Sequence, residues 1–221
     1  MSNTALPHDF RDRFAALHTA LVCDSVDRMG LEPQVMNHQI RPVYTGATIV
    51  GRALPVLWAP VYRPPEKPYA HLFNAYRALE QNDVLVMTTS GFRTAGVWGG
   101  LLATAARAQG CIGAIIDGLT RDVDEIEEIS FPVFARGQSP LDSEGRAEAI
   151  EWGTPINCGG GLVRHGDIVF ADYMGGVFIP AEAAPEVLAR AEEKQSGESD
   201  VRDILATGRD VGDVFREYGI L

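Results

Sequence analysis

Two adjacent residues of opposite charge, Arg121 and Asp122, are the strongest candidates for chemistry in this chain. They follow residues 111–116, an apolar segment rich in β-branched residues that predicts a strand covered on both faces. Asp117 and Gly118 are predicted to end that strand in a tight turn. α/β proteins tend to place functional groups where a buried strand ends. The pattern therefore indicates a site in which a cation lies beside a carboxylate.

The same pair also has a purely structural interpretation. Asp122 followed by Glu125 fits a capping box at the start of a helix predicted over residues 123–129. Arg121 would then be a surface residue paired with one of the nearby carboxylates. The local pattern taken alone favours this structural interpretation for both residues.

The elements before the pair raise the functional interpretation. Residues 84–89 predict a second apolar strand, residues 90–99 a loop, and residues 101–109 an alanine-rich helix that ends at Gly110. Strand, helix and strand in this order predict a βαβ unit with parallel strands, so the segment 97–100 lies at the same sheet edge as Arg121. The helix after Gly99-Gly100 presents unpaired N–H groups that suit a carboxylate or phosphate.

The rest of the chain predicts a mixture of helices and strands in one domain, residues 1–221. A helical tail over about 182–221 is expected to pack on the body or on a neighbouring subunit. The predicted segments are helices at 9–20, 21–29 and 71–80, a strand at 48–58 bent at Gly51 or divided there into two, a proline-rich loop at 60–68, a strand at 131–135, an irregular segment at 137–153, a hairpin at 160–172 turning at His165-Gly166, a strand at 177–180, and tail helices at 182–195, 200–206 and 211–218.

Composition excludes several classes of protein. The apolar fraction is 46% and the net charge is −11, which is ordinary for a globular protein and argues against a nucleic-acid partner. Three dispersed cysteines favour reduced thiols rather than disulfides or zinc. Residues 1–7 show no signal peptide, and no apolar segment approaches membrane-spanning length. A soluble, cytoplasmic protein with no membrane partner is expected.

Motifs exclude further chemistries. The chain has no Gly-x-Ser-x-Gly nucleophile turn, no Walker loop, no Rossmann glycine pattern after a strand and no His/Cys cluster with zinc spacing. Its two lysines, Lys67 and Lys194, lie in a proline-rich loop and in a charged helix, where a Schiff base is not expected. A carbon–carbon lyase built on this chain would therefore use a metal, and Mg²⁺ suits a site with one carboxylate and several waters.

Several motifs together resemble the family that contains regulator of ribonuclease activity A and the 4-hydroxy-4-methyl-2-oxoglutarate/4-carboxy-4-hydroxy-2-oxoadipate aldolases. The resemblance begins near Asp24 and covers nearly the whole chain. The matching segments are Gly113-Ala-Ile-Ile-Asp-Gly-Leu-Thr-Arg-Asp122, Phe131-Pro-Val-Phe-Ala-Arg-Gly137, Pro155-Ile-Asn-Cys-Gly-Gly160, His165-Gly-Asp-Ile-Val-Phe-Ala-Asp172, Gly176-Val-Phe-Ile-Pro180 and Tyr218-Gly-Ile-Leu221.

The resemblance implies an αββα sandwich like the phosphohistidine swivelling domain, assembled as a trimer or hexamer with sites between subunits. It implies that Asp122 holds a divalent metal, Mg²⁺ or Mn²⁺, and that Arg121 contacts the substrate and stabilises an enolate. It further implies that the backbone amides of Gly99, Gly100, Leu101 and Leu102 bind the carboxylate of a pyruvyl group. The expected contribution from an adjacent subunit is assigned to Glu198.

The sequence departs from the aldolases at Gly100, where they tend to carry an acidic residue. The predicted function is a metal-dependent lyase that acts on a 2-oxo acid and releases pyruvate through a metal-stabilised enolate, by retro-aldol cleavage or by decarboxylation of oxaloacetate. Two alternatives remain open. One is a non-catalytic binding protein that regulates a ribonuclease, and the other is a related enzyme of the same family acting on a different acid.

Overall fold

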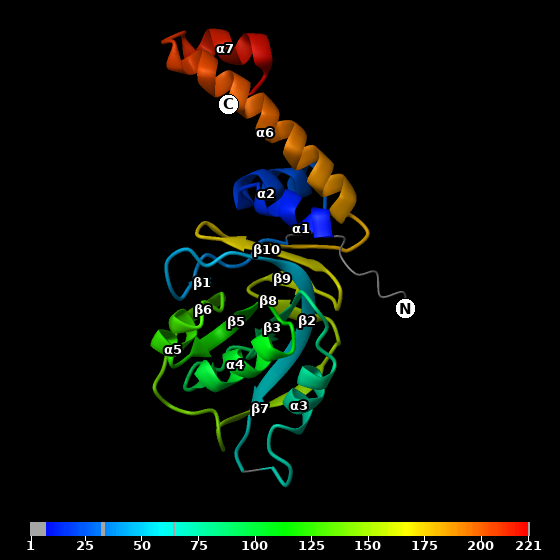
Figure 1. The fold of residues 1–221 in the computed structure, drawn as a ribbon, viewed down its shortest axis with the longest axis vertical. Helices are drawn as coiled ribbons and strands as arrows, with labels where there is room; N and C mark the ends of the chain where they lie inside the picture. Colours follow the sequence, from blue (N-terminus) through cyan, green and yellow to red (C-terminus); the bar gives the residue numbers. More distant parts are fainter. Residues whose placement is uncertain (1–7, 32–33, 64, 221) are drawn as a thin grey trace.

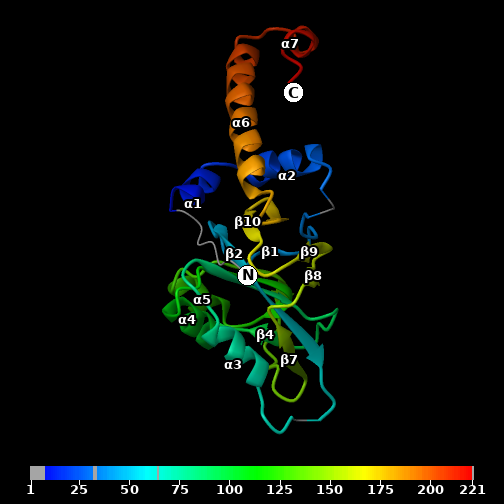
Figure 2. The same cartoon turned by 90° about the vertical axis from the view of Figure 1, so that its right-hand side faces the viewer.

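The computed structural model describes residues 8–31, 34–63 and 65–220. Sequence predictions on residues 1–7, on Pro64 in the proline-rich loop and on Leu221 lie outside these described residues. Figures 1 and 2 show a body built around a β-sheet, with helices at one end and a long helix that extends away from the body.

Four parallel strands form the centre of the sheet. β2 (Ile49–Pro60), β3 (Asp83–Thr88), β5 (Gly113–Thr120) and β6 (Val133–Gln138) are neighbours in the order β6-β5-β3-β2. β3 and β5 are joined through α4 (Gly100–Ala108), which confirms the predicted βαβ unit. The near-continuous apolar sequences of β3 and β5 are explained by burial of both faces.

The remaining strands extend this sheet on both sides. They are β1 (Arg41–Pro42) beside β6, β4 (Gly96–Trp98) beside the end of β5, β7 (Ala147–Trp152) and β10 (Ile168–Asp172) beside β2, and β11 (Gly175–Ile179) beside β10. β8 (Ile156–Cys158) and β9 (Gly161–Val163) pair with each other in a separate sheet. The result is a mixed α/β fold with a nearly closed sheet and C-terminal helices, and the predicted fold class is confirmed.

Alternate residues of the central strands face two different hydrophobic clusters. Leu85 and Met87 of β3 belong to a cluster shared with α3 (Ala70–Arg77), α4 and α5 (Val123–Glu128). Val84 and Val86 belong to a cluster on the opposite face, which includes side chains of β8, β9 and β11. The period of two in these side chains therefore fixes which helices cover which face.

A third cluster joins the sheet to the helical end of the molecule. There α1 (His8–Ala15), α2 (Thr19–Arg28) and the first turns of α6 (Ala184–Ala206) pack on β10 and β11. α6 then rises from the body, and α7 (Val211–Tyr218) lies at its far end (Figures 1 and 2). Among the described residues, no helix is both long enough and apolar enough to cross a membrane.

Two glycines that look like breaks in the sequence lie inside strands. The strand predicted to end at Asp117-Gly118 does not end there, because β5 continues to Thr120, so this prediction is wrong. Of the two alternatives for the segment 48–58, the single strand is confirmed, and Gly51 lies in its interior. A Cβ at Gly118 would lie 2.5 Å from Thr89 Cγ2, and one at Gly51 would lie 2.5 Å from the Asn82 carbonyl oxygen. Both glycines allow a close approach of neighbouring chain segments rather than a turn.

Several predicted boundaries also change. The helix predicted at 9–20 ends at Ala15, and α2 begins at Thr19. β9 and β10 do not form the predicted hairpin over 160–172, because β9 pairs with β8 and β10 pairs with β11 and β2. The segment 137–153 is not irregular throughout, since it contains β7.

The tail is one long helix where a break was predicted. α6 runs without interruption through Ser196 and Gly197. A Cβ at Gly197 would lie 2.9 Å from Ile220 Cδ1, so this glycine allows close packing of the chain after α7. The predicted helix at 211–218 is confirmed.

Candidate functional site

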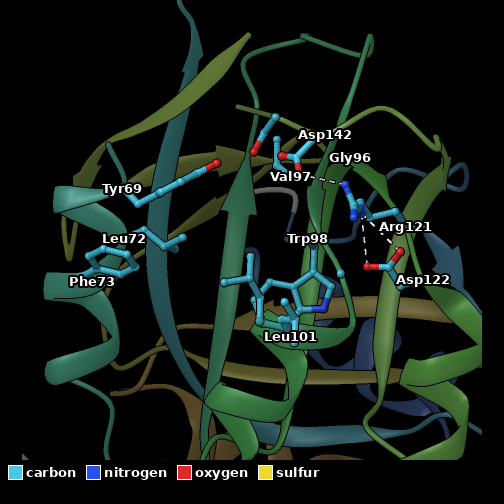
Figure 3. A pocket seen from close by; sticks show the side chains of 13 residues that line it. Tyr69, Leu72, Phe73, Gly96, Val97, Trp98, Leu101, Arg121, Asp122 and Asp142 are labelled. Carbon is cyan, nitrogen blue, oxygen red and sulfur yellow. Dashed lines mark hydrogen bonds and ion pairs between the residues drawn. The ribbon is translucent and has the colours of Figure 1, made fainter. Parts of the chain in front are cut away.

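A pocket of about 280 Å³ lies where β5 ends, between α3 and the first turn of α4 (Figure 3). Gly99, Leu101, Leu102, Arg121 and Asp122 all line it. Five of the six residues predicted from the sequence near the strand end are therefore brought to one cavity. Gly100, the sixth, adjoins it as the first residue of α4.

Strand pairing fixes the position of Arg121. The short strand β4 runs parallel to the end of β5, and the backbone N–H of Arg121 donates to the Trp98 carbonyl oxygen at 2.9 Å. The Arg121 guanidinium lies between two carboxylates, with Nε 3.2 Å from both Asp122 oxygens and Nη1 2.9 Å from Asp142 Oδ2. The hydrogen bond to Asp122 and the charge of that carboxylate raise the pKa of Arg121 above its usual value. Arg121 is therefore a fixed cation in the pocket.

Asp122 occupies the N-cap position of α5 without acting as a side-chain cap. Its backbone is left-handed, with φ of 53°, and its side chain makes no capping hydrogen bond to α5. Instead, Oδ2 accepts a hydrogen bond from the Gly100 N–H at 3.3 Å. The predicted capping box is therefore wrong. A non-glycine residue held at positive φ beside a pocket is typical of functional sites.

The two glycines at the start of α4, its N-cap Gly99 and its first residue Gly100, make room for carboxylates. A Cβ at Gly99 would lie 2.5 Å from Asp122 Oδ2, and a Cβ at Gly100 would lie 2.1 Å from Glu125 Oε2. Glu125 thus places its carboxylate against the N-terminus of α4 instead of completing a capping box. Such positions favour negative charge because they face the positive end of the helix dipole.

The backbone N–H groups at the N-terminus of α4 are the predicted binding site for a ligand carboxylate, and one of them is already bonded within the protein. The Gly100 N–H donates to Asp122, whereas the N–H groups of Leu101 and Leu102 follow in the first helical turn and have no acceptor within the helix. A ligand carboxylate that enters the pocket would meet these two groups beside the Arg121 guanidinium.

Sequence reasoning missed several lining residues, among them Tyr69, Phe73, Asp142 and Ser143. Asp142 arrives because its segment runs beside β4, with the Gly96 N–H donating to the Leu141 carbonyl oxygen at 2.9 Å. Phe73 comes from α3 and Tyr69 is the N-cap residue of that helix, which precedes the strand pair in the sequence. Local patterns carry no signal for such contacts, because they arise only from tertiary packing.

Glu198 does not line this pocket. It lies on α6, the helix that extends away from the body (Figure 1), and its carboxylate is 3.4 Å from the Lys194 ammonium group on the same helix. Its predicted contribution to the site of a neighbouring subunit stays a prediction.

The donor set at Asp122 determines which metal the site could hold. No group of three or more His, Cys, Asp or Glu side chains suited to a metal ion occurs among residues 8–31, 34–63 and 65–220. The Asp122 side chain is 30% exposed, so its carboxylate has room for a further partner. Mg²⁺ keeps several waters and binds through one or two carboxylates. The residues therefore fit a largely hydrated Mg²⁺ and do not fit a fully protein-coordinated metal.

The cysteine thiols and lysine amines, which would suggest another chemistry, are absent from the described pocket lining. Burial raises the pKa of the Cys23 and Cys111 thiols to about 11, and it also raises that of Cys158, so none of the three is a thiolate at neutral pH. Lys67 and Lys194 do not line the pocket. The described lining offers an arginine, carboxylates, backbone amides and the hydroxyl groups of Ser143 and Tyr69.

Comparison with known proteins gives the family. Residues 19–178 match the family model RraA-like, described as Aldolase/RraA. The chain belongs to the RraA-like family. This confirms the resemblance inferred from the motifs. The matched residues include 99–102, Arg121 and Asp122.

Relatives within the RraA-like family carry different names. An uncharacterized protein of Methanocaldococcus jannaschii is 37% identical over 54% of this chain, and the matched part spans only 57% of that relative. A protein of Halalkalibacterium halodurans named "Putative 4-hydroxy-4-methyl-2-oxoglutarate aldolase" is 29% identical over 85% of this chain and 84% of its own length. The Streptomyces coelicolor protein RraAS2, described as an unusual member of the RNase ES inhibitor RraA protein family, has a TM-score of 0.80. At 22% identity over 91% of this chain and 99% of that protein, it shows a shared fold.

Proposed function

We propose that the pocket at Arg121 and Asp122 cleaves a carbon–carbon bond of a 2-oxo acid and releases pyruvate, with Mg²⁺ or Mn²⁺ as cofactor. The observation that carries the proposal is the junction of three groups at one strand end. Arg121 is held by the Trp98 carbonyl, Asp122 is held by the Gly100 N–H, and the first turn of α4 faces both of them.

Each group has a role that follows from its chemistry. The N–H groups of Leu101 and Leu102 would bind the substrate carboxylate, as helix N-termini bind anions. The Arg121 guanidinium would stabilise the negative charge that develops on the 2-oxo oxygen when the bond breaks. Asp122, with its exposed carboxylate face, would hold the divalent cation. When bound, that cation would supply Lewis-acid polarisation of the 2-oxo group.

The reaction balances without an external oxidant or reductant. In retro-aldol cleavage of a 4-hydroxy-2-oxo acid, the bond between C3 and C4 breaks and its electron pair stays on C3. The 4-hydroxyl proton leaves, C4 becomes the carbonyl of the second product, and C3 takes up a proton to give pyruvate. Decarboxylation of oxaloacetate uses the same site, with carbon dioxide as the second product.

The proposal is tested by incubating the full chain with Mg²⁺ and a panel of 2-oxo acids and measuring pyruvate. We expect pyruvate from at least one acid, loss of activity in EDTA and recovery with Mg²⁺ or Mn²⁺. Borohydride added with substrate should trap no adduct. A substrate-dependent adduct on Lys67 or Lys194 would contradict the proposed chemistry.

A non-catalytic protein that regulates a ribonuclease is the alternative within the same family. Such a protein needs neither a metal nor the Arg121–Asp122 pair at the pocket. Absence of pyruvate from the whole panel, together with tight binding to a ribonuclease, would favour it.

A further inference from the structure

The pocket has two walls of opposite character. Figure 3 shows Arg121, Asp122 and Asp142 together on one side and, on the other, Leu72 and Phe73 of α3 with its N-cap residue Tyr69. Trp98 lies between the two sides. The proposed reaction uses only the polar wall, formed by Arg121, Asp122 and Asp142. The apolar wall, formed by Tyr69, Leu72 and Phe73, is left to contact another part of a ligand.

The apolar wall is fixed in place by buried polar contacts. The Tyr69 backbone is left-handed, with φ of 60°, and its N–H donates to Glu148 Oε2 at 2.9 Å. Glu148 is buried, which restrains this strained start of α3. The centroids of the Tyr69 and Phe73 rings lie 6.0 Å apart, so the two rings form neighbouring parts of one aromatic surface.

A second contact links this wall to the N-terminal turn of α4. The Tyr76 hydroxyl of α3 donates to the Leu102 carbonyl oxygen of α4 at 2.8 Å, and burial raises the pKa of that hydroxyl. The hydrogen bond therefore persists at ordinary pH. It holds α3 at a set separation from the first turn of α4, so the apolar wall faces the far end of any ligand whose carboxylate lies on Leu101 and Leu102.

The charges in the pocket disfavour a second anionic group on the ligand. Arg121 is the one cationic side chain among the described lining residues, and both Asp122 and Asp142 already pair with it. A second carboxylate directed at α3 would lose its hydration beside aromatic rings without gaining a cation. The apolar surface, by contrast, is ready to be covered, since Phe73 is 49% exposed and Leu101 is 84% exposed.

We infer that the substrate is a 4-hydroxy-2-oxo acid whose C4 carries an apolar or aromatic group rather than a second carboxylate. This inference rests on the proposed function and adds the class of the second product, an apolar aldehyde or ketone. The carboxylate end is bound at α4 and Arg121, and the apolar end packs on Tyr69 and Phe73.

The test compares two substrates that differ only in the group on C4, a phenyl ring in 4-hydroxy-2-oxo-4-phenylbutanoate and a carboxylate in 4-hydroxy-2-oxoglutarate. Pyruvate release with Mg²⁺ gives kcat/KM for each. We expect the phenyl substrate to be preferred by about tenfold or more. Preference for the carboxylate substrate would overturn this inference and leave the proposed function standing. No pyruvate from either substrate would also overturn this inference, and no pyruvate from oxaloacetate and the rest of the panel would in addition overturn the proposed function.

Variants of Phe73 show whether α3 sets this preference. Phe73→Ala should lower kcat/KM for the phenyl substrate about tenfold, mainly through KM, and change the carboxylate substrate less than about twofold. Phe73→Arg should reverse the preference, because it supplies the missing cation. Asn74→Arg is the matched control, since it adds the same charge at the next position of α3, outside the pocket lining, and should keep the wild-type preference.

The competing role for the exposed wall is contact with a second copy of the chain. Sedimentation of Phe73→Ala and wild type separates the two roles. An unchanged association state with the altered KM supports a substrate-binding wall. Dissociation of the variant with equal effects on both substrates would overturn the inference.

Discussion

At the scale of single residues, the site depends on two different proposed roles, charge stabilisation by Arg121 and metal binding by Asp122. The guanidinium contacts both Asp122 oxygens and Asp142, while the Asp122 carboxylate also accepts the Gly100 N–H. The two side chains are thus coupled in geometry. Their proposed roles differ, however, so substitutions should separate turnover from metal binding.

Arg121→Lys keeps the positive charge and loses the planar guanidinium that can make two parallel hydrogen bonds. We expect turnover to fall about 100-fold, in line with removal of one group that stabilises developing negative charge. The Mg²⁺ concentration for half-maximal activity should change little. Arg107→Lys on the exposed side of α4 is the matched control and should keep wild-type kinetics; equal loss in both variants would exclude a specific role for Arg121.

Gly99→Ala tests whether the site needs the close approach of Asp122 to α4. The added Cβ would lie 2.5 Å from Asp122 Oδ2, so that carboxylate must move. Activity should fall and the Mg²⁺ requirement should rise. Combined with Asp122→Asn, the alanine should cost little further activity, because effects that act through one group are not additive. Additive losses in kinetic measurements of the two single variants and the double variant would show that Gly99 acts elsewhere.

Residue types and spacing were enough to predict Arg121, Asp122 and the Gly99–Gly100 seat, because parallel strands bring their carboxyl ends together. The left-handed backbone of Asp122 was not predictable in this way. Its energy is offset by contacts to Gly100 and Arg121 that exist only in the fold. Asp142 was missed for a related reason, since it reaches Arg121 through pairing of its segment with β4.

At the scale of elements, the buried strands were predicted well, whereas Gly118 in a strand and Gly197 in a helix were misinterpreted as breaks. Continuous apolar sequence identified β3 and β5, and the alanine-rich pattern identified α4. Gly51, Gly118 and Gly197 look like breaks in a linear pattern. In the fold each one faces an atom from a distant segment, which only tertiary packing reveals.

Gly51→Ala should therefore destabilise the sheet. Its Cβ would lie 2.5 Å from the Asn82 carbonyl oxygen and 2.8 Å from Val84 Cγ2, and the backbone oxygen has little freedom to move. We expect the free energy of unfolding to fall by about 1–3 kcal/mol. Gly137→Ala on β6 is the control, because its nearest atom would be 3.4 Å away, and it should change stability by less than about 0.5 kcal/mol. Equal urea midpoints for both variants would contradict the packing argument.

At the scale of the whole molecule, the C-terminal helices are the part whose role the single chain explains least. Val211, Phe215 and Tyr218 of α7 are 53%, 50% and 41% exposed, on a helix at the far end of α6 (Figure 2). An exposed apolar face of this kind commonly marks a contact with another chain. The sequence predicted these helices, their sparse apolar content and their packing on the body or on a neighbouring subunit, but not which residues would form such a contact.

We expect the protein to sediment as a trimer or hexamer at micromolar concentration. Phe215→Asp should shift it towards smaller species, because a charge would replace apolar contact area at α7. Glu198→Gln should leave the assembly unchanged and lower turnover if α6 reaches the site of a neighbouring subunit. A wild-type monomer with full activity would refute both the assembly and the role of Glu198.

The most direct test of the central claim is the Mg²⁺ dependence of pyruvate release by Asp122→Asn. The amide keeps the shape of the side chain and can still accept the Gly100 N–H, but it gives up the charge that would hold the cation. We predict loss of metal-dependent activity across the whole Mg²⁺ titration, with the free energy of unfolding within about 1 kcal/mol of wild type. Wild-type turnover and an unchanged Mg²⁺ titration in Asp122→Asn would contradict the metal site.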